Sequence, residues 1–428
     1  MGDLLNLQQP LLDGGIRSVN FFNGRLLTGK DLSREQDARR ASDWRLGEAI
    51  GDGVAFGLDV VEDSNAEKKL GDSPSAVLNV SAGLAINRNG QVLRLTSETN
   101  VRLVRPVQGA TAEGKIFGAC DGAGGRYFAG AGLYLLTIAP AEASEGKAPT
   151  NGLDLLNVRC NTDATVEGLQ FRLLPVKASL YAGADPSSAT FRNDLAYRCF
   201  GSAIRSAWLA DPFGADLDPY GMVDDMRASG LTDCDVPLAL VFMVGATAIR
   251  FIDQWAVRRA PHCHPGTPSW MPFLSPRRLA EGQAMFFQFQ AHIDWLRSKA
   301  TGDLGSVTAA SDFSFLPPVG VIPVNREADK TDTHALKFFA GLTTRGPAFI
   351  NAARLEMLVR QSVLYPPVDT ASGEMLWLYR VRENAQAVDA AGDGGPRSYV
   401  VFASGHIPYA GDAQFDLARW DYANFALR

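Results

Sequence analysis

Two histidines and a cysteine lie side by side in His262-Cys263-His264, within the loop PHCHPG. Two imidazoles and a thiolate are borderline-soft ligands that suit Zn²⁺. Alternate residues of an extended loop point in opposite directions, so these three side chains are not expected to reach one ion together. A fourth ligand would have to come from a distant residue such as Cys234 or His292. We therefore expect a rigid, proline-bounded loop and no cofactor, with His262, Cys263 and His264 as weak candidates for a metal site.

Other reactive residue types lack the spacing that catalysis needs. No Gly-x-Ser-x-Gly elbow occurs, and the five histidines lie in unrelated contexts. The glycine-rich run from Gly118 to Gly125 precedes no helical pattern, which phosphate and dinucleotide sites require. The carboxylate pair Asp224-Asp225 lies in a turn-rich stretch, where Asp favours capping and Asx turns. We expect a protein without enzymatic activity, although a glycosidase pair of acids distant in sequence would leave no local motif.

Composition and charge narrow the classes of partner. The chain has 428 residues, of which 46% are hydrophobic and 21% are charged, a balance typical of globular proteins. Its 47 acidic and 41 basic residues give a net charge of −6, which argues against nucleic acid as a partner. No apolar run approaches the roughly 18 residues of a membrane span, and no signal-peptide pattern is present. We expect no nucleic-acid binding and no direct membrane insertion.

Five cysteines are dispersed along the chain without a CxxC pair. An odd and scattered set is typical of reduced thiols in a cytosolic compartment. We therefore expect synthesis and assembly in the cytoplasm.

A charged helix is predicted near the N-terminus. Thr28 with Asp31 three residues later resembles a capping box, and residues 31–50 contain no proline. Gly51 then ends the helix, because glycine accepts the left-handed conformation. The preceding Phe21-Phe22-Asn23-Gly24 predicts a turn. The apolar stripe of this helix is narrow, which is typical of a helix that bridges solvent or packs on a polar partner.

The middle of the chain predicts mainly strands. Apolar residues alternate at period two over 78–86 and return over 92–95 after the turn Arg88-Asn89-Gly90-Gln91. Residues 140–152 predict a loop. Short strands separated by turns favour an antiparallel β-sandwich or barrel-like domain over residues 75–180.

The second half mixes both patterns. Two buried strands are predicted over 236–244 and 249–252, followed by Arg258 and Arg259, which we expect to be exposed. Residues 277–299 predict an amphipathic helix. Three prolines in 313–324 exclude a helix there and predict an extended segment running along the surface. A helix over 348–363 and strands over 376–381 and 399–403 complete the pattern.

These patterns predict an α+β fold with four parts. They are an N-terminal arm, turn and helix (1–62), an antiparallel β domain (63–182), a mixed α/β domain (183–330) and a C-terminal α+β element with an aromatic docking tail (331–428).

The N-terminal block carries a family resemblance. Its residues match an aromatic-Asn-Gly turn, an "LLT" motif, an acidic helix start and a closing Gly-x-x-x-Gly-Leu-x-Val, namely Phe22, Asn23, Gly24, Leu26, Leu27, Thr28, Asp31, Glu35, Gln36, Gly53, Gly57, Leu58 and Val60. This block resembles the N-terminal signature of structural proteins encoded with phage-tail-like contractile injection systems. Further similarity lies in RFIDQWAVRR and FLPPVGVIPV. The resemblance implies a baseplate, tail-fibre or shell subunit in a particle that is released or stays with the envelope.

Contact with other chains is therefore the expected role. The partners would be copies of the chain itself, as a trimer or hexamer, and other injection-system subunits. The expected interface residues are Phe21, Phe22, Asn23, Gly24, Trp44, Phe286, Phe287, Pro317, Pro318, Trp420, Tyr422 and Phe425. Two alternatives stay open. One is a receptor- or glycan-binding module at the distal end of the particle, and the other is an envelope-polymer hydrolase with two facing carboxylates.

Overall fold

The structure is a computed structural model. It describes residues 12, 14–64, 69–70, 73–103, 114–115, 130–149, 160–201, 221–262, 276–299, 304, 306–324, 333–382 and 398–404. The expected docking tail with Trp420, Tyr422 and Phe425 lies outside these residues, as do Cys263 and His264.

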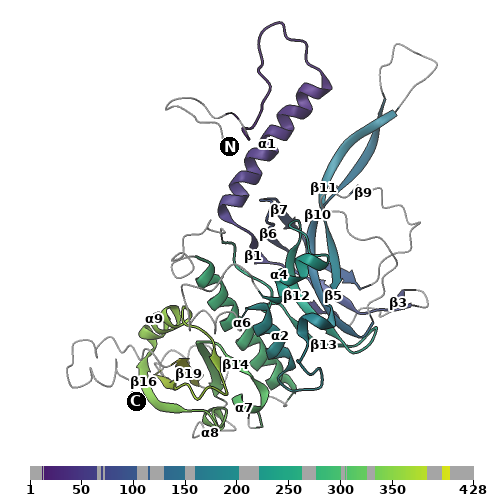
Figure 1. Cartoon of the computed structure of the whole chain (residues 1–428). Helices are drawn as coiled ribbons and strands as arrows, with labels where there is room; N and C mark the ends of the chain where they lie inside the picture. Colours follow the sequence, from purple (N-terminus) through teal and green to yellow (C-terminus); the bar gives the residue numbers. More distant parts are fainter. Residues whose placement is uncertain are drawn as a thin grey trace, which may run out of the picture.

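The N-terminal half is built from antiparallel strands (Figure 1). One sheet has the order β1-β6-β7, with β1 (Gly53–Gly57), β6 (Gly83–Ile86) and β7 (Val92–Leu95). A second has the order β2-β5-β8, with β2 (Val60–Glu62), β5 (Val77–Val80) and β8 (Thr99–Arg102). The short strands β3 (Lys69–Leu70) and β4 (Ser73–Pro74) pair with each other. The expected turn is present, because Gly90 donates to Asn87 and has a φ of 75°.

The third sheet has the order β11-β10-β12-β13. Its strands are β10 (Gly132–Pro149), β11 (Cys160–Pro175), β12 (Val236–Met243) and β13 (Ile249–Asp253), and β9 (Gly114–Lys115) pairs with β10. Leu78, Ala85, Leu136 and Leu238 come from all three sheets and bury one shared hydrophobic core. This sheet therefore crosses the boundary expected at residue 182. The described strands form no closed barrel.

The hairpin of β10 and β11 is much longer than expected. Its pairing runs without a register shift from Tyr134↔Pro175 to Pro149↔Cys160. The prediction of a loop over 140–152 is therefore wrong for residues 140–149. Cross-strand pairing with β11 overrides the weak strand propensity of that stretch, which is rich in Ala, Glu and Pro.

Helices fill the centre of the molecule. They are η2 (Ala178–Tyr181), α2 (Phe191–Cys199), α4 (Met222–Asp225), η3 (Met226–Ser229) and the long α6 (Pro276–Lys299). Phe191, Tyr197 and Phe200 from α2 and its C-terminus pack against β12, β13 and Met285 of α6 in a second core. The amphipathic pattern of residues 277–299 thus predicted α6 correctly.

A mixed sheet with the order β15-β19-β18-β16 forms the C-terminal part. Its elements are α7 (Ala309–Asp312), β14 (Phe315–Leu316), β15 (Val319–Val324), α8 (Thr333–Lys337), β16 (Thr344–Asn351), α9 (Ala352–Ser362), β17 (Val368–Asp369), β18 (Leu376–Arg382) and β19 (Ser398–Ser404). The strands β16 and β18 are parallel, and the other pairs are antiparallel. Because β15 pairs with β19, this sheet crosses the boundary expected at residue 330. The molecule as a whole is α+β, as predicted.

The proline-containing segment 313–324 does not run along the surface. Phe313, Leu316 and Ile322 lie in the core between α6 and the C-terminal sheet, and Pro317 and Pro318 are buried. The expectation of an exposed segment is wrong, because β15 is an edge strand, where proline is tolerated, and its apolar side chains pack under α6.

Candidate functional site

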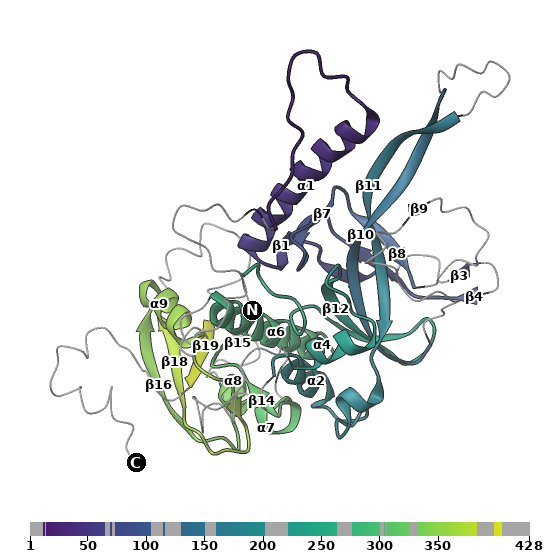
Figure 2. The ribbon, with the colours of Figure 1, turned by 45° about the horizontal axis from the view of Figure 1, so that its top comes forward.

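The N-terminal arm, defined here as residues 14–50, projects from the body of the molecule (Figures 1 and 2). Its helix α1 (Gly29–Ile50) begins with a capping box between Thr28 and Asp31. Hydrogen bonds from the hydroxyl and backbone N–H of Thr28, and then the Arg25 guanidinium, lower the pKa of the Asp31 carboxyl. At the other end Gly51 caps the helix by donating to the Gly47 carbonyl. The sequence predicted both ends.

An extended segment precedes α1 and lies along it. The Val19 backbone N–H donates to Oε2 of Glu35 over 3.3 Å, and Nη2 of Arg45 donates to the Gly14 carbonyl over 2.6 Å. Val19 is buried against the helix. The expected turn closes at Phe22, whose carbonyl accepts from the Arg25 N–H over 3.2 Å. The arm is therefore a defined unit made of a helix and an extended segment.

The arm exposes most of its apolar side chains. All residues of α1 are described, and among them only Gly47 is buried. Leu26 is 86% exposed and Phe22 is 63% exposed. The other exposed side chains are Ile16, Phe21, Leu27, Leu32, Leu46 and Ile50. At roughly 150–200 Å² for each large side chain when fully exposed, these eight present on the order of 800 Å². The apolar area alone approaches what one partner buries in a standard protein interface.

A charged brace links the arm to the long hairpin. Arg40, near the middle of α1, lies 2.6 Å from Oε1 of Glu167 in β11 and 3.8 Å from Oε1 of Glu142 in β10. These side chains are partly exposed, so this charged contact orients the arm relative to the hairpin but contributes little to stability.

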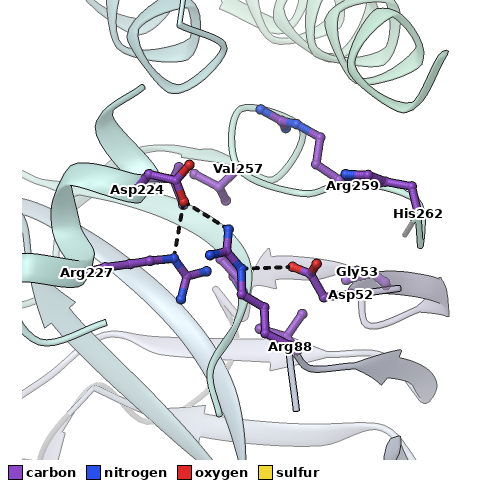
Figure 3. Close-up of a pocket in the computed structure, with 12 residues that line it drawn as sticks. Asp52, Gly53, Arg88, Asp224, Arg227, Val257, Arg259 and His262 are labelled. Atoms are coloured by element: carbon purple, nitrogen blue, oxygen red, sulfur yellow. Dashed lines mark hydrogen bonds and ion pairs between the residues drawn. The ribbon is translucent and has the colours of Figure 1, made fainter. Parts of the chain in front are cut away.

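The base of the arm lies beside a small cavity lined by charged residues (Figure 3). Arg88 points between two acids, with Nη2 3.0 Å from Asp224 and Nε 3.6 Å from Asp52. Arg227 reaches the same oxygen of Asp224 over 3.2 Å. Asp52 follows Gly51, the C-cap of α1, and also forms a backbone bridge with His262. The network thus joins the arm, the β6–β7 turn and α4.

The size of this cavity and the pairing of its acids limit the chemistry that it could support. It has a volume of about 30 Å³, which holds on the order of two water molecules. Asp52 and Asp224 are both paired with Arg88, so they do not face each other across a substrate-sized gap. The arrangement is suited to fixing the base of the arm.

Arg258 and Arg259 are buried, so the expectation that both are exposed is wrong. Arg258 donates to Oδ1 of Asp59 over 3.0 Å and to the Gly57 carbonyl, and burial lowers its pKa. Arg259 donates to backbone carbonyls, including that of Arg258 over 2.7 Å. Bonds to turn carbonyls offset the desolvation of each guanidinium.

The metal candidates are only partly within the described residues. His262 is buried, and its Nδ1 lies 2.9 Å from the Ala260 carbonyl. Of the two distant candidates, Cys234 is disulfide-bonded, so its sulfur is not a free thiolate. The expectation of reduced cysteines is thus wrong for Cys234. No group of three His, Cys, Asp or Glu side chains in the described part of the chain is arranged to hold a metal ion.

His292, the other distant candidate, lies in a separate buried polar cluster. Its ring is fully buried beside Phe313, and neither ring nitrogen has a hydrogen-bond partner among the described residues. Nearby, Nε of Arg192 and Nε2 of Gln288 both donate to Oδ2 of Asp253, over 2.8 and 2.9 Å. Burial lowers the pKa of His292 well below its usual value, and the positive charges of Arg192 and Lys299 add to this.

The expected interface residues fall into three groups. Phe21, Phe22, Asn23 and Gly24 are exposed on the arm. Trp44 and Phe286 are half-buried, and Phe287 is exposed but stacks on Trp255 with ring centroids 4.6 Å apart. Pro317 and Pro318 are buried within the chain, so they are not available to a partner in this structure.

Sequence reasoning missed the charged network and the close approach of Gly47 to Gly90. Neither has a local sequence signal, because their partners come from distant segments.

Comparison with known proteins does not assign the chain to a family. No protein-family model matches the chain, and no curated protein matches it significantly. Within the described residues, the helices are all too short or too polar to cross a membrane.

Proposed function

We propose that this chain is a structural, non-enzymatic subunit of a phage-tail-like contractile injection particle. In this role it holds baseplate-peripheral, fibre or outer-shell subunits together through its N-terminal arm. The observation that carries the proposal is the arm itself, in which α1 buries only Gly47 and the segment before α1 leaves Phe22 and Leu26 exposed to solvent. A helix of this kind gains its stability from a partner.

Two further features support an assembly role. The outer part of the β10–β11 hairpin extends beyond β12, and a two-stranded hairpin is marginally stable alone. The three N-terminal sheets share one core, and a sandwich-like packing of them would give the arm and hairpin a rigid base. The disulfide at Cys234 suits a particle that reaches an oxidising environment after assembly.

The alternatives have less support. Among the described residues that line the cavity at the base of the arm there is no Phe, Tyr or Trp, which a glycan-binding pocket would need for stacking. Its two aspartates are both paired with Arg88, so they are not arranged as a facing acid and base.

Particle incorporation tests the proposal. Purified contractile particles are sedimented, and the bound chain is quantified by mass spectrometry. Leu26→Asp with Leu27→Asp should lower the bound fraction at least tenfold, because charge replaces exposed apolar surface on the arm. The control is Val244→Asp with Val92→Asp, two exposed apolar positions outside the arm. Wild-type chain that never sediments with particles contradicts the proposal, as does an arm variant that binds like the control.

A further inference from the structure

The β11 strand leaves one edge of its sheet open. It is the last strand in the order β11-β10-β12-β13. Its pairing with β10 continues to Pro149↔Cys160, whereas β12 pairs with β10 only up to Ile138. Beyond Ile138 the short strand β9 still pairs with β10, at Glu142 and Ala143, but on the β10 side of the hairpin. Among the described strands, none pairs with the outer edge of β11 (Figure 1).

The register shows which residues of β11 face outward. Val176 donates to the Leu133 carbonyl over 2.9 Å, which makes these two a hydrogen-bonded pair. Such pairs alternate along an antiparallel ladder, and this ladder has no register shift. The odd-numbered residues Asp163, Thr165 and Glu167 therefore direct their backbone N–H and C=O groups away from β10. In the described part of the chain, none of these groups has a hydrogen-bond partner.

This edge is protected against strand addition by acidic side chains and not by prolines or bulges. Natural edge strands carry charged side chains, prolines or bulges that block pairing, and here the charged ones are Asp163 and Glu167. Between residues 161 and 174 the β11 sequence contains neither proline nor lysine, and its pairing contains no bulge. Residues 163–168 are exposed. The outer edge of β11 is therefore available as a template for a strand that carries basic side chains.

The same chain contains an extended segment that pairs with no described sheet. Residues 15–22 precede the turn of the arm and belong to no strand. Among the described residues, the backbone groups of Ile16, Arg17 and Ser18 have no hydrogen-bond partner. The segment is about as long as the open outer edge of β11. It also contains β-branched and aromatic residues such as Ile16 and Phe21, which favour strands.

Charge makes the two elements complementary. Residues 14–50 hold seven basic and five acidic side chains and so have a net charge of +2. Because the whole chain has a net charge of −6, the remaining residues have a net charge of −8. The outer hairpin bears Glu142, Glu145, Asp163 and Glu167, of which Glu142 and Glu167 already meet Arg40 of the same chain. On the basic side, Arg17 lies within the extended segment, and Arg25 follows it and is paired with Asp31. A second β11 would instead bring acids against acids, which disfavours self-pairing of two hairpins.

Within one chain these elements are kept apart. In both views α1 lies between the extended segment and the hairpin (Figures 1 and 2). We propose that residues 15–22 of one copy add as a further strand to the outer edge of β11 in a second copy. The contact is head-to-tail, so repetition generates a ring or an open array. This names a partner for the proposed assembly role and rests on it.

Mixed cross-linking tests the contact directly. Full-length Ser18→Cys and Thr165→Cys variants are prepared separately and treated with a short bis-maleimide, alone and mixed. Both positions are exposed. The mixture should give a two-chain product at least tenfold more abundant than either variant alone, and peptide mapping should join residues 18 and 165. Equal yields in the mixture and the single variants overturn the proposal.

A proline at the open edge gives an independent test. Thr165→Pro removes an outward N–H and leaves the bonds to β10 intact, since residue 165 does not bond to β10. Analytical ultracentrifugation should show at least tenfold weaker self-association for Thr165→Pro than for its matched control Thr165→Ala, which keeps the N–H. Equal association of the two variants, or a wild-type chain that stays monomeric at all concentrations, overturns the proposal.

The two proposals fail in different ways. If the chain forms the 18–165 cross-link but does not enter particles, the particle role is contradicted and the strand addition is kept. If the chain enters particles but does not form that cross-link, only the strand addition is contradicted.

Discussion

Gly47 of α1 and Gly90 of the β6–β7 turn touch backbone to backbone. A Cβ atom built on Gly47 would lie 2.0 Å from the Gly90 carbonyl oxygen, and one on Gly90 would lie 1.9 Å from the carbonyl oxygen of Trp44. The arm therefore meets the body of the molecule where no side chain fits. This contact explains how a helix with a single buried residue keeps a defined direction.

Gly47→Ala should push α1 off the turn. We expect a loss of about 1–3 kcal/mol in the free energy of unfolding, because the new methyl group overlaps backbone atoms that cannot rotate away. Gly29→Ala is the matched control, since a Cβ there meets nothing within 4 Å. The control should be neutral or stabilising by up to about 1 kcal/mol. Urea denaturation measures both, and equal effects would contradict the contact.

Arg88→Met should weaken the network at the base of the arm. Asp52 and Asp224 each lose an ion pair, although Arg227 still reaches Asp224. We expect a cost of about 1–3 kcal/mol in unfolding free energy. The control is Arg360→Met, which breaks an exposed i,i+4 pair with Glu356 and should cost less than about 0.5 kcal/mol. Thermal unfolding of the two variants gives the comparison, and a smaller loss for Arg88→Met than for the control would be inconsistent with the network.

His292 should make stability fall on acidification. Its pKa is lowered in the folded state, mainly by burial and then by Arg192 and Lys299. Below the unfolded value near 6.5 the unfolded chain binds a proton that the folded chain does not, so stability is full above about pH 6.5. It then falls by up to about 1.4 kcal/mol per pH unit as pH drops. Asp253, which is paired with Arg192, keeps the charge of that guanidinium partly balanced.

Denaturation midpoints between pH 7.5 and 5 measure this slope. His292→Leu should flatten it, because leucine has no proton to bind in either state. A variant that keeps the wild-type slope would assign the acid sensitivity to another group.

Cys199 and Cys234 should resist alkylation for different reasons. Cys199 is buried, and desolvation raises the pKa of its thiol to about 12. Iodoacetamide at pH 8 should label it only after denaturation, because the thiolate is the reactive form. Cys234 should be labelled only after denaturation and reduction, since it is disulfide-bonded. Mass spectrometry of the digested protein distinguishes the two cases, and labelling of native Cys199 would contradict its burial.

Local patterns alone determined much of this protein. The capping box of Thr28 and Asp31, the glycine stop at Gly51, the buried strand β12, the half-buried strand β13 and the amphipathic α6 depend on neighbours in sequence, so their signals are local. Tertiary structure decided the rest. The hairpin through residues 140–149 depends on pairing with β11, and burial of Pro317 and Arg258 depends on segments far along the chain. The Gly47–Gly90 contact and the open edge of β11 are likewise products of packing and sheet order, which no short stretch of sequence encodes.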